Sequence, residues 1–271
     1  MSRRIKVVSL AIALMLVSTA GSSQDFSEAA NALGRGDYAA AMDGYRPLAE
    51  QGDARAQTAL GYLYLDGLGV PQNYPEALRW YGSAAEQGFA AAQISLGYMY
   101  MKGSGVPVNV AEAARWYRLA AEQGSPIAER LLGSIYEQGF GVPQDYAEAL
   151  RWNRLAADQG DAEGQVALGM MYYRGNGVST DLTEAVRWYR LAAQQGHAGA
   201  QAILGAHYEE GFGVLQDYVL AYMWQNLASA NGFVDASDNR ERLSRMMSPS
   251  SILEAQRRSR VCMESRYTDC D

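Results

Sequence analysis

Two histidines and two cysteines are the side chains of this chain best suited to metal binding or redox chemistry. His197 and His207 lie ten residues apart, and Cys262 and Cys270 both fall within the last ten residues. A zinc site needs three or four thiolate, imidazole or carboxylate ligands brought together. The histidines have no further histidine or cysteine near them in the sequence, so the pattern predicts no metal site.

The sequence also lacks the common signatures of catalysis. Neither Lys6 nor Lys102 follows a serine by three residues, as the S-x-x-K motif of serine β-lactamases and penicillin-binding proteins requires. The H-E-x-x-H, P-loop and G-x-S-x-G motifs are missing as well. We therefore expect no enzyme activity and no cofactor.

A period of 36 residues organises the chain instead. Every tryptophan lies 36 residues from the next, and a glycine and a tyrosine of each unit keep the same register. The tryptophans are Trp80, Trp116, Trp152, Trp188 and Trp224. Self-similarity at such a period is typical of proteins that stack one supersecondary unit, and these proteins use their extended surfaces for binding.

Each unit is predicted to be a pair of helices. In the first unit, Ala56, Leu60 and Leu63 share one face at helical spacing, which indicates an amphipathic first helix. The segment G-L-G-V-P that follows supplies glycines for the turn and a proline that prevents the helix from continuing. Asn73, with Glu76 three residues later, has the spacing of a capping box and starts the second helix.

Two positions inside the helices hold residues that an amphipathic helix does not usually have there, a glycine and a histidine. Gly61 recurs in all five units in the middle of the first helix, where glycine costs about 1 kcal/mol relative to alanine. We expect a neighbouring helix to approach closely there, with the tryptophan ring covering the glycine. In the fifth unit His207 occupies the place of Leu63, and an apolar residue also fills it in the other units, which favours a partly buried packing role.

The repeats set the predicted domain boundaries. Residues 1–20 are a signal peptide, residues 25–52 a degenerate N-terminal cap similar to a tetratricopeptide repeat, and residues 233–271 a helical C-terminal cap. The five full repeats between them are 53–88, 89–124, 125–160, 161–196 and 197–232.

The recurring pattern A-x-x-x-L-G-x-x-Y-x-x-G-x-G-V-P-x-[DN]-x-x-E-A-x-x-W-Y-x-x-A-A-x-Q-G resembles the Sel-1-like repeat family, which is related to the tetratricopeptide repeats. Ten positions are identical in all five units; the match is close over 53–232 and loose over 25–52. The C-terminal segment also resembles the tail of exported bacterial members. The resemblance implies an all-α fold, an α/α solenoid wound as a right-handed superhelix, that serves as an adaptor, an envelope regulator or a factor contacting host proteins.

The chain departs from one branch of that family. Relatives with the β-lactamase-type label carry a disulfide in each repeat, whereas both cysteines of this chain lie after the last repeat. The chain therefore does not resemble the cysteine-rich branch.

The N-terminus has the features of an export signal. Arg3, Arg4 and Lys6 precede an apolar run over residues 7–17, and residues 18–20 offer small side chains for cleavage. Eleven apolar residues are too few to span about 30 Å of hydrocarbon with ease, so a cleaved signal is favoured over a permanent anchor. The two arginines also suggest the twin-arginine route, but Lys6 stands where that signal favours a large apolar residue, so general secretion is preferred.

Cleavage would leave an acidic protein. Loss of residues 1–20 removes three positive charges and moves the formal charge from −7 to −10. Such a surface repels nucleic acid and anionic lipid. We expect a periplasmic or secreted protein with no stable membrane anchor and no nucleic-acid partner.

Cys262 and Cys270 are expected to form a disulfide, because an even number of cysteines in an exported protein favours pairing. Closing so short a loop contributes about 2–3 kcal/mol in the chain-entropy model. A redox or metal pair is the alternative, and the seven-residue gap without a nearby histidine argues against it.

Binding residues are sought among positions that vary between repeats while sharing one face of the first helices. These are the sixth, tenth and thirteenth residues of each unit, on the face turned away from the packing stripe. The candidates for a concave partner-binding face are Tyr62, Leu65, Tyr98, Met101, Arg130, Glu137, Met170 and Tyr173. Tyrosine and methionine are enriched at interfaces. The alternative is that some of these residues simply pack between helices.

The function that these observations favour is an exported scaffold that binds a protein or peptide partner as an adaptor or regulator of the cell envelope. Binding to peptidoglycan or another glycan is the alternative, since exposed aromatic rings also stack on sugars. A weak hydrolase of cell-wall or β-lactam substrates ranks last.

Overall fold

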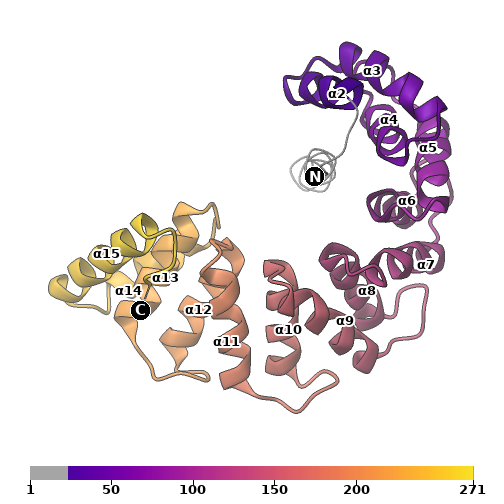
Figure 1. The fold of residues 1–271 in the computed structure, drawn as a ribbon. Coiled ribbons are helices and arrows are strands. Elements are labelled where there is room, and N and C mark those ends of the chain that lie inside the picture. Colours follow the sequence, from indigo (N-terminus) through magenta and orange to yellow (C-terminus); the bar gives the residue numbers. More distant parts are fainter. Residues whose placement is uncertain (1–23, 271) are drawn as a thin grey trace. The chain divides into compact units, whose positions relative to one another are not determined.

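The computed structural model describes residues 24–270, and within that range the regular elements are α-helices without any strand (Figure 1). The predicted signal peptide, residues 1–20, lies outside the described residues. The chain forms two compact units, residues 24–128 with 140–142 and residues 129–139 with 143–270.

The helices of the first unit are α2 (Gln24–Gly34), α3 (Tyr38–Glu50), α4 (Ala54–Asp66), α5 (Tyr74–Glu86), α6 (Ala90–Lys102) and α7 (Val110–Ala121). Helix α8 (Pro126–Gln138) begins in the first unit and continues in the second. The second unit then holds α9 (Tyr146–Asp158), α10 (Ala162–Arg174), α11 (Leu182–Ala193), α12 (Ala198–Glu210), α13 (Tyr218–Ala230), α14 (Ala236–Ser244) and α15 (Pro249–Glu264).

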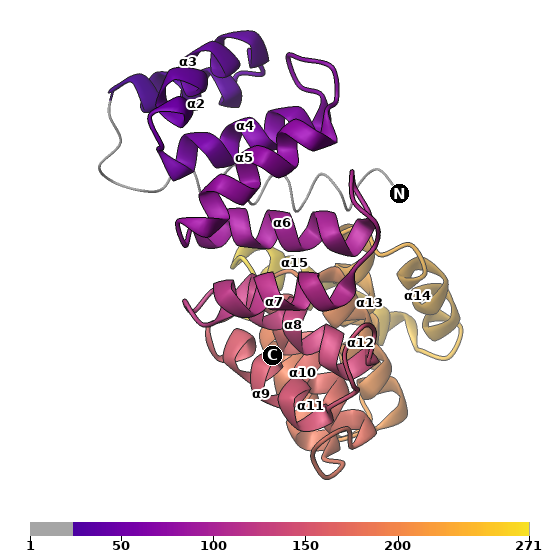
Figure 2. The same cartoon turned by 90° about the vertical axis from the view of Figure 1, so that its right-hand side faces the viewer.

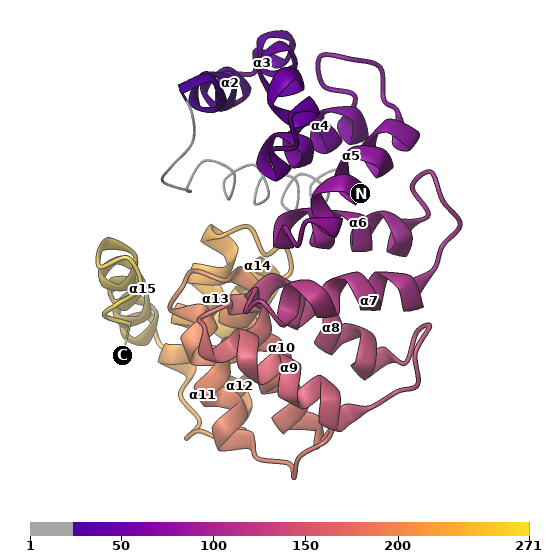
Figure 3. The same ribbon diagram turned by 45° about the vertical axis from the view of Figure 1, so that its right-hand side comes forward.

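Helices that follow one another in the chain pack side by side within each unit. In the first unit α4 packs on α5, and α6 on α7 (Figure 2). In the second unit α10 packs on α11, and α13 contacts both α14 and α15 (Figure 3). The five predicted repeats are helix pairs from α4–α5 to α12–α13, and the all-α solenoid fold expected from the sequence is confirmed.

The contact at the recurring mid-helix glycine differs from the expectation. An alanine Cβ at Gly61 would lie 2.7 Å from the ring of Tyr81, and one at Gly97 would lie 2.7 Å from the ring of Tyr117. The side chain that covers the glycine therefore belongs to the residue after the tryptophan, which is a tyrosine beside Gly61, Gly97 and Gly169 and an amide beside Gly133 and Gly205. The predicted tryptophan contact was wrong, because the second helix turns this next residue toward the first helix.

Each second helix starts with a simpler cap than the predicted capping box. The Asn73 side chain accepts a hydrogen bond from the backbone N–H of Glu76 at 3.2 Å, which is the expected half of the box. The backbone N–H of Asn73 donates instead to the carbonyl of Tyr64 on the first helix, at 2.9 Å. The reciprocal bond from Glu76 is therefore not needed, and that half of the prediction was wrong.

The glutamate forms an ion pair instead. Glu76 contacts Arg79 at 2.7 Å, and the guanidinium carbon of Arg79 lies 3.8 Å from the ring centre of Trp80. The same group of three recurs as Glu112–Arg115–Trp116, Glu148–Arg151–Trp152 and Glu184–Arg187–Trp188. Each exposed ion pair contributes a few tenths of a kcal/mol, and each stacked guanidinium about 0.5–1 kcal/mol. Together they cover the outer side of a largely buried tryptophan.

A ladder of side-chain amides joins successive helix pairs. Gln57 is buried and donates to the carbonyl of Ala49 at 3.0 Å, while its own carbonyl accepts from Gln87 at 2.8 Å. The same arrangement recurs at Gln93 with Gln123, Gln165 with Gln195, and Gln201 with Asn231. Buried amides are stable only when hydrogen-bonded, so the ladder fixes how each first helix sits on its neighbours.

In repeat three a carboxyl group replaces the amide of this ladder. Glu129 replaces the glutamine, is only 2 % exposed, and accepts a hydrogen bond from Gln159 at 2.7 Å. Burial raises the pKa of the Glu129 carboxyl, the nearby Asp161 carboxylate adds to this, and the bond from Gln159 opposes it. An ionised carboxylate has no proton to donate, whereas the glutamine side chains do. Ionisation of Glu129 therefore lowers the stability of the fold.

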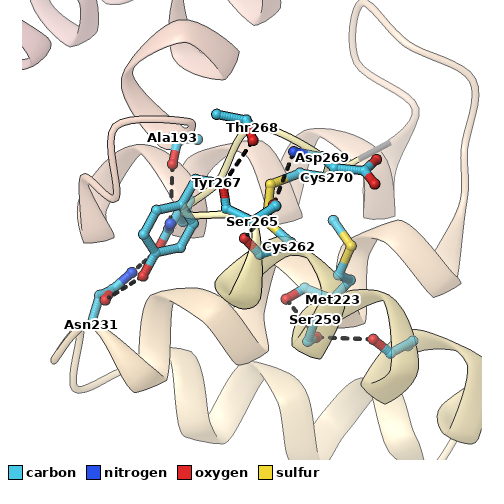
Figure 4. The surroundings of a disulfide bond; sticks show 12 residues. Ala193, Met223, Asn231, Ser259, Cys262, Ser265, Tyr267, Thr268, Asp269 and Cys270 are labelled. Atoms are coloured by element: carbon cyan, nitrogen blue, oxygen red, sulfur yellow. Dashed lines mark hydrogen bonds between the residues drawn. A yellow bond between two sulfur atoms is a disulfide. The ribbon is translucent and has the colours of Figure 1, made fainter.

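The C-terminal segment closes the ladder (Figure 4). Cys262 and Cys270 form the expected disulfide, and both are buried. The loop between them places the Tyr267 hydroxyl where it donates to the Asn231 side chain at 2.9 Å. Asn231 in turn donates to Gln201 at 2.9 Å. The disulfide loop therefore supplies the last hydrogen bond of the ladder.

Substitution of the mid-helix glycine should destabilise the fold although alanine is the better helix former. For Gly61→Ala we expect a net loss of about 1–2 kcal/mol, because crowding of the Tyr81 ring outweighs the gain in helix propensity. Gly82→Ala on α5 is the matched control. A Cβ there meets no atom within 4 Å, so we expect a gain of about 0.5–1 kcal/mol. Urea unfolding measures both, and a gain from Gly61→Ala would contradict the close contact.

Replacement of Glu129 by glutamine should stabilise the protein in a pH-dependent way. Folding raises the pKa of the Glu129 carboxyl. Such a group lowers the stability of the fold once the pH exceeds the pKa of the unfolded state, and the loss is complete above the pKa of the folded state. Glu129→Gln removes this cost and keeps an acceptor for Gln159. We expect a gain of about 1 kcal/mol at pH 7.5 that disappears below about pH 4.

Thermal unfolding across this pH range measures the effect, with Glu86→Gln as the control because Glu86 is exposed. The control should change little at any pH. An equal gain for Glu129→Gln at pH 4 and pH 7.5 would show that ionisation of Glu129 is not the cause.

Candidate functional site

In the first compact unit, residues 24–128 with 140–142, two of the predicted binding residues lie half-buried beside the core. Tyr62 and Leu65 pack at the edge of the cluster around Tyr81, Met99 and Trp116. Burial raises the pKa of Tyr62 to about 12, and the nearby Asp66 carboxylate adds to this. These contacts favour packing for Tyr62 and Leu65, the alternative that the sequence left open.

The other two candidates of this unit are on α6. Tyr98 and Met101 are partly exposed, and the Lys102 ammonium lies 5.8 Å from the Tyr98 ring centre. Burial raises the pKa of the Tyr98 hydroxyl, with the Asp66 carboxylate contributing. Tyr98 is therefore held between a cation and the packed interior of the unit.

The two charged candidates of repeat three serve different contacts. Arg130 forms an ion pair with Asp161 at 3.0 Å, and Asp161 also caps α10 by accepting from the backbone N–H of Gly164. Glu137 lies 3.8 Å from Arg174 at the end of α10. Arg130 is thus committed to holding α8 against the start of α10, whereas Glu137 reaches the neighbourhood of the remaining two candidates.

Met170 and Tyr173 line a pocket of about 280 Å³ in the second unit. Its walls come from three helices and one loop: α10, α11, α12 and the turn after α12. The lining residues are Met170, Tyr173, Arg174, Tyr189, Ile203, Ala206, His207, Glu210 and Phe212. Most of this surface is apolar, and the charged groups among the lining residues are Arg174 and Glu210.

His207 is the central polar group of this pocket and is only 6 % exposed. Three rings surround the imidazole, with centres 5.6 Å away for Tyr173, 5.3 Å for Tyr189 and 6.3 Å for Phe212. Its Nδ1 lies 2.8 Å from the carbonyl oxygen of Phe212. A carbonyl only accepts, so Nδ1 carries the proton and donates.

The protonation of His207 follows from this environment. Burial lowers the pKa of the imidazole below its ordinary value of about 6.5, and the bond to the Phe212 carbonyl opposes the shift only in part. The ring is therefore neutral at pH 7. Because Nδ1 holds the proton, Nε2 presents a lone pair and can accept a hydrogen bond.

The same position of the other repeats lacks this pocket chemistry. In repeat two, Met99 stands where His207 does, and Tyr98 stands where Ala206 does. The small Ala206 side chain leaves room that Tyr98 occupies in the earlier repeat. The pocket thus depends on a small residue at a variable position and on a histidine at a position that is apolar in the other repeats.

Sequence reasoning found Met170 and Tyr173 but not the rest of the pocket. The change from an apolar residue to His207 predicts a packing role, which agrees with the burial of this side chain. Tyr189 stands in register with Tyr81 and Tyr117, and Phe212 with Phe140, so no sequence signal separated them from core and loop residues. The substitution of a small residue at Ala206 beside a histidine was the one available signal.

His197 has a structural contact of its own, apart from the pocket. His197 accepts a hydrogen bond from the backbone N–H of Ala200 through Nδ1 and so caps α12. Over residues 24–270, no group of three or more histidine, cysteine, aspartate or glutamate side chains is arranged to hold a metal ion. In the same residues no helix is long and apolar enough to cross a bilayer.

Comparison with known protein families finds the same repeat frame. The Sel1 repeat model matches residues 54–89, 90–125, 126–161, 162–197 and 198–233, one residue later than the boundaries predicted from the sequence. Among curated proteins, none matches the chain.

Solved structures extend the match beyond the repeats. The crystal structure of a Sel1 repeat protein from Oxalobacter formigenes is 34 % identical, covers 90 % of this chain and 97 % of its own, and superposes with a TM-score of 0.75. A protective antigen of uropathogenic Escherichia coli strains with an SLR fold is 24 % identical, with a TM-score of 0.49 and coverage of 97 % of this chain and 79 % of its own. From the five matched repeats and the Oxalobacter structure we conclude that the chain belongs to the Sel1 repeat family.

Proposed function

We propose that this protein is an exported scaffold that binds a protein or peptide partner in the cell envelope, as an adaptor or regulator. Sel1 repeats generally build protein-interaction modules, and that much follows from family membership. Partner binding by this chain, and its place in the envelope, are the steps that we add.

The pocket around His207 carries the proposal. Its wall includes Met170 and Tyr173, whose positions vary between repeats, while those of Leu168 and Gly169 on the same helix are identical in all five. Tyr173 is 42 % exposed, although most other residues of α10 are buried or half-buried. A variable, partly apolar hollow on a constant frame is the usual form of a binding site in a repeat protein.

Two observations support export. The N-terminal residues have the charge and hydropathy pattern of a signal peptide. The disulfide between Cys262 and Cys270 is compatible with an oxidising compartment, where such bonds persist. Both fit a periplasmic or secreted location.

The binding proposal is tested with a charged substitution at the pocket and a matched one elsewhere in the same repeat. Mature protein, residues 21–271, serves as bait in an envelope extract beside Tyr173→Glu and Leu191→Glu. Leu191 on α11 is 36 % exposed, so the two variants place the same charge on surfaces of similar accessibility. We expect a partner that the wild type and Leu191→Glu retain and that Tyr173→Glu loses by at least tenfold.

Folding and glycan binding are checked in the same experiment. All three baits should melt within a few degrees of one another. An identical set of captured proteins on all three would overturn binding at the pocket. Co-sedimentation of the wild type with purified peptidoglycan sacculi, without any captured protein, would support the glycan alternative instead.

Export makes a separate prediction about the N-terminus. Full-length protein expressed in a Gram-negative host should be recovered from the periplasm or medium with residue 21 as its first residue, as measured by intact-mass spectrometry. Replacing Arg3, Arg4 and Lys6 with glutamate should block this, because a signal peptide needs a positive N-terminal region. Uncleaved wild type that stays in the cytoplasm would contradict export.

A further inference from the structure

We propose that the pocket around His207 holds one aromatic side chain of a peptide partner, a tryptophan or tyrosine whose N–H or O–H donates a hydrogen bond to Nε2 of His207. The inference rests on the proposed function and names the chemistry that the partner presents. It follows from the size of the pocket, its walls and its buried imidazole.

The size of the pocket fits a single side chain. At about 280 Å³ it lies just below the range of roughly 300–1,000 Å³ typical of pockets for whole small-molecule ligands. Met170 and Ile203 provide aliphatic walls, and Ala206 leaves one side without bulk. An aromatic side chain buries a large apolar area in such a space with few rotatable bonds to restrict.

The surrounding rings favour an aromatic occupant. Tyr173, Tyr189 and Phe212 enclose the imidazole, and the rings of Tyr173 and Phe212 meet it edge-on. Aromatic groups attract one another in edge-to-face and offset arrangements, by about 0.5–1.5 kcal/mol beyond their buried area. A further ring entering the pocket can make the same contacts.

The buried imidazole specifies a hydrogen-bond donor on that ring. His207 is 94 % buried, and within residues 24–270 its hydrogen bond to the protein runs through Nδ1 to the Phe212 carbonyl. His207 lines the pocket, and its Nε2 is not among the fully buried side-chain atoms that lack a hydrogen-bond partner, so Nε2 is accessible. A ligand that filled the pocket without a donor would exclude water from Nε2 and leave this acceptor unpaired, which is costly, so a ligand that donates to Nε2 is favoured.

Charged groups of the lining suit a peptide backbone. Arg174 and Glu210 lie on α10 and α12, and the arginine side chain is exposed. A guanidinium donates to peptide carbonyls, and a carboxylate accepts from peptide N–H groups. These two groups are available to hold a peptide main chain beside the inserted ring.

The experiment measures binding of three capped amino acids to mature protein by NMR. The probes are N-acetyl-tryptophanamide, N-acetyl-tyrosinamide and N-acetyl-phenylalaninamide, and the readout includes the Hε1–Cε1 resonance of His207. We expect the tryptophan and tyrosine probes to shift this resonance and to bind up to about tenfold more tightly than phenylalanine, which has no donor.

Two variants built from residues of the same register serve as controls. His207→Met places at this position the methionine that repeats two and four have there, as Met99 and Met171. It should remove the preference for the tryptophan and tyrosine probes, while the phenylalanine probe binds as before. Ala206→Tyr places at this position the tyrosine that repeats one and two have there, as Tyr62 and Tyr98, and should block binding of all three probes. Thermal unfolding confirms that both variants fold.

Several outcomes overturn the inference. Equal binding of the three probes removes the role of His207, and binding of none removes the pocket as an aromatic site. Tighter binding of free tryptophan than of its capped form points to a small metabolite in place of a peptide. If the probes fail while Tyr173→Glu still loses its captured partner, the proposed function stands and the aromatic anchor alone is wrong.

Discussion

The distance between the two helices of a repeat depends on one contact, between a glycine in the middle of the first helix and the side chain after the tryptophan on the second. Where that side chain is Tyr81, Tyr117 or Tyr189, its ring lies where the Cβ of any larger residue would be. The glycine costs helix stability, and the close approach of the helices offsets that cost through the buried ring area. At Gly169 the same contact also positions Tyr189, so the pocket in repeats four and five depends on it.

Polar groups then set the register between repeats. The helix pairs bury mostly alanine, leucine and tryptophan, and such packing has little directional preference. The glutamine ladder supplies direction, because each buried amide must reach a particular carbonyl and a particular neighbour. Tyr267 ends the ladder with a hydroxyl donated to Asn231, and the disulfide holds that loop in place. Glu129 is the exception, a rung whose strength depends on protonation.

A constant frame of this kind leaves a few positions free to differ. The residues before and after the packing stripe of the first helix change from repeat to repeat, and the frame tolerates this because neither the glycine contact nor the amide ladder involves them. In repeat five Ala206 uses this freedom, while His207 replaces the apolar residue of the packing stripe itself. A small residue opens the space, and a buried imidazole gives the space one hydrogen-bonding atom. A binding site can therefore arise without any change in the fold.

The sequence by itself determined the helix pairs, their caps, the loops and the disulfide, because periodicity, glycine and asparagine placement and cysteine position act locally along the chain. It misjudged which ring covers the mid-helix glycine and how Glu76 is used, because both depend on the angle at which two helices meet. It also could not separate Tyr62, which packs at the edge of a core, from Tyr173, which lines a pocket. These two residues lie on corresponding faces of first helices. Only the packing of α10, α11 and α12 decided that Tyr173, Tyr189 and Phe212 surround His207, since the space around a side chain is set by neighbours distant in sequence.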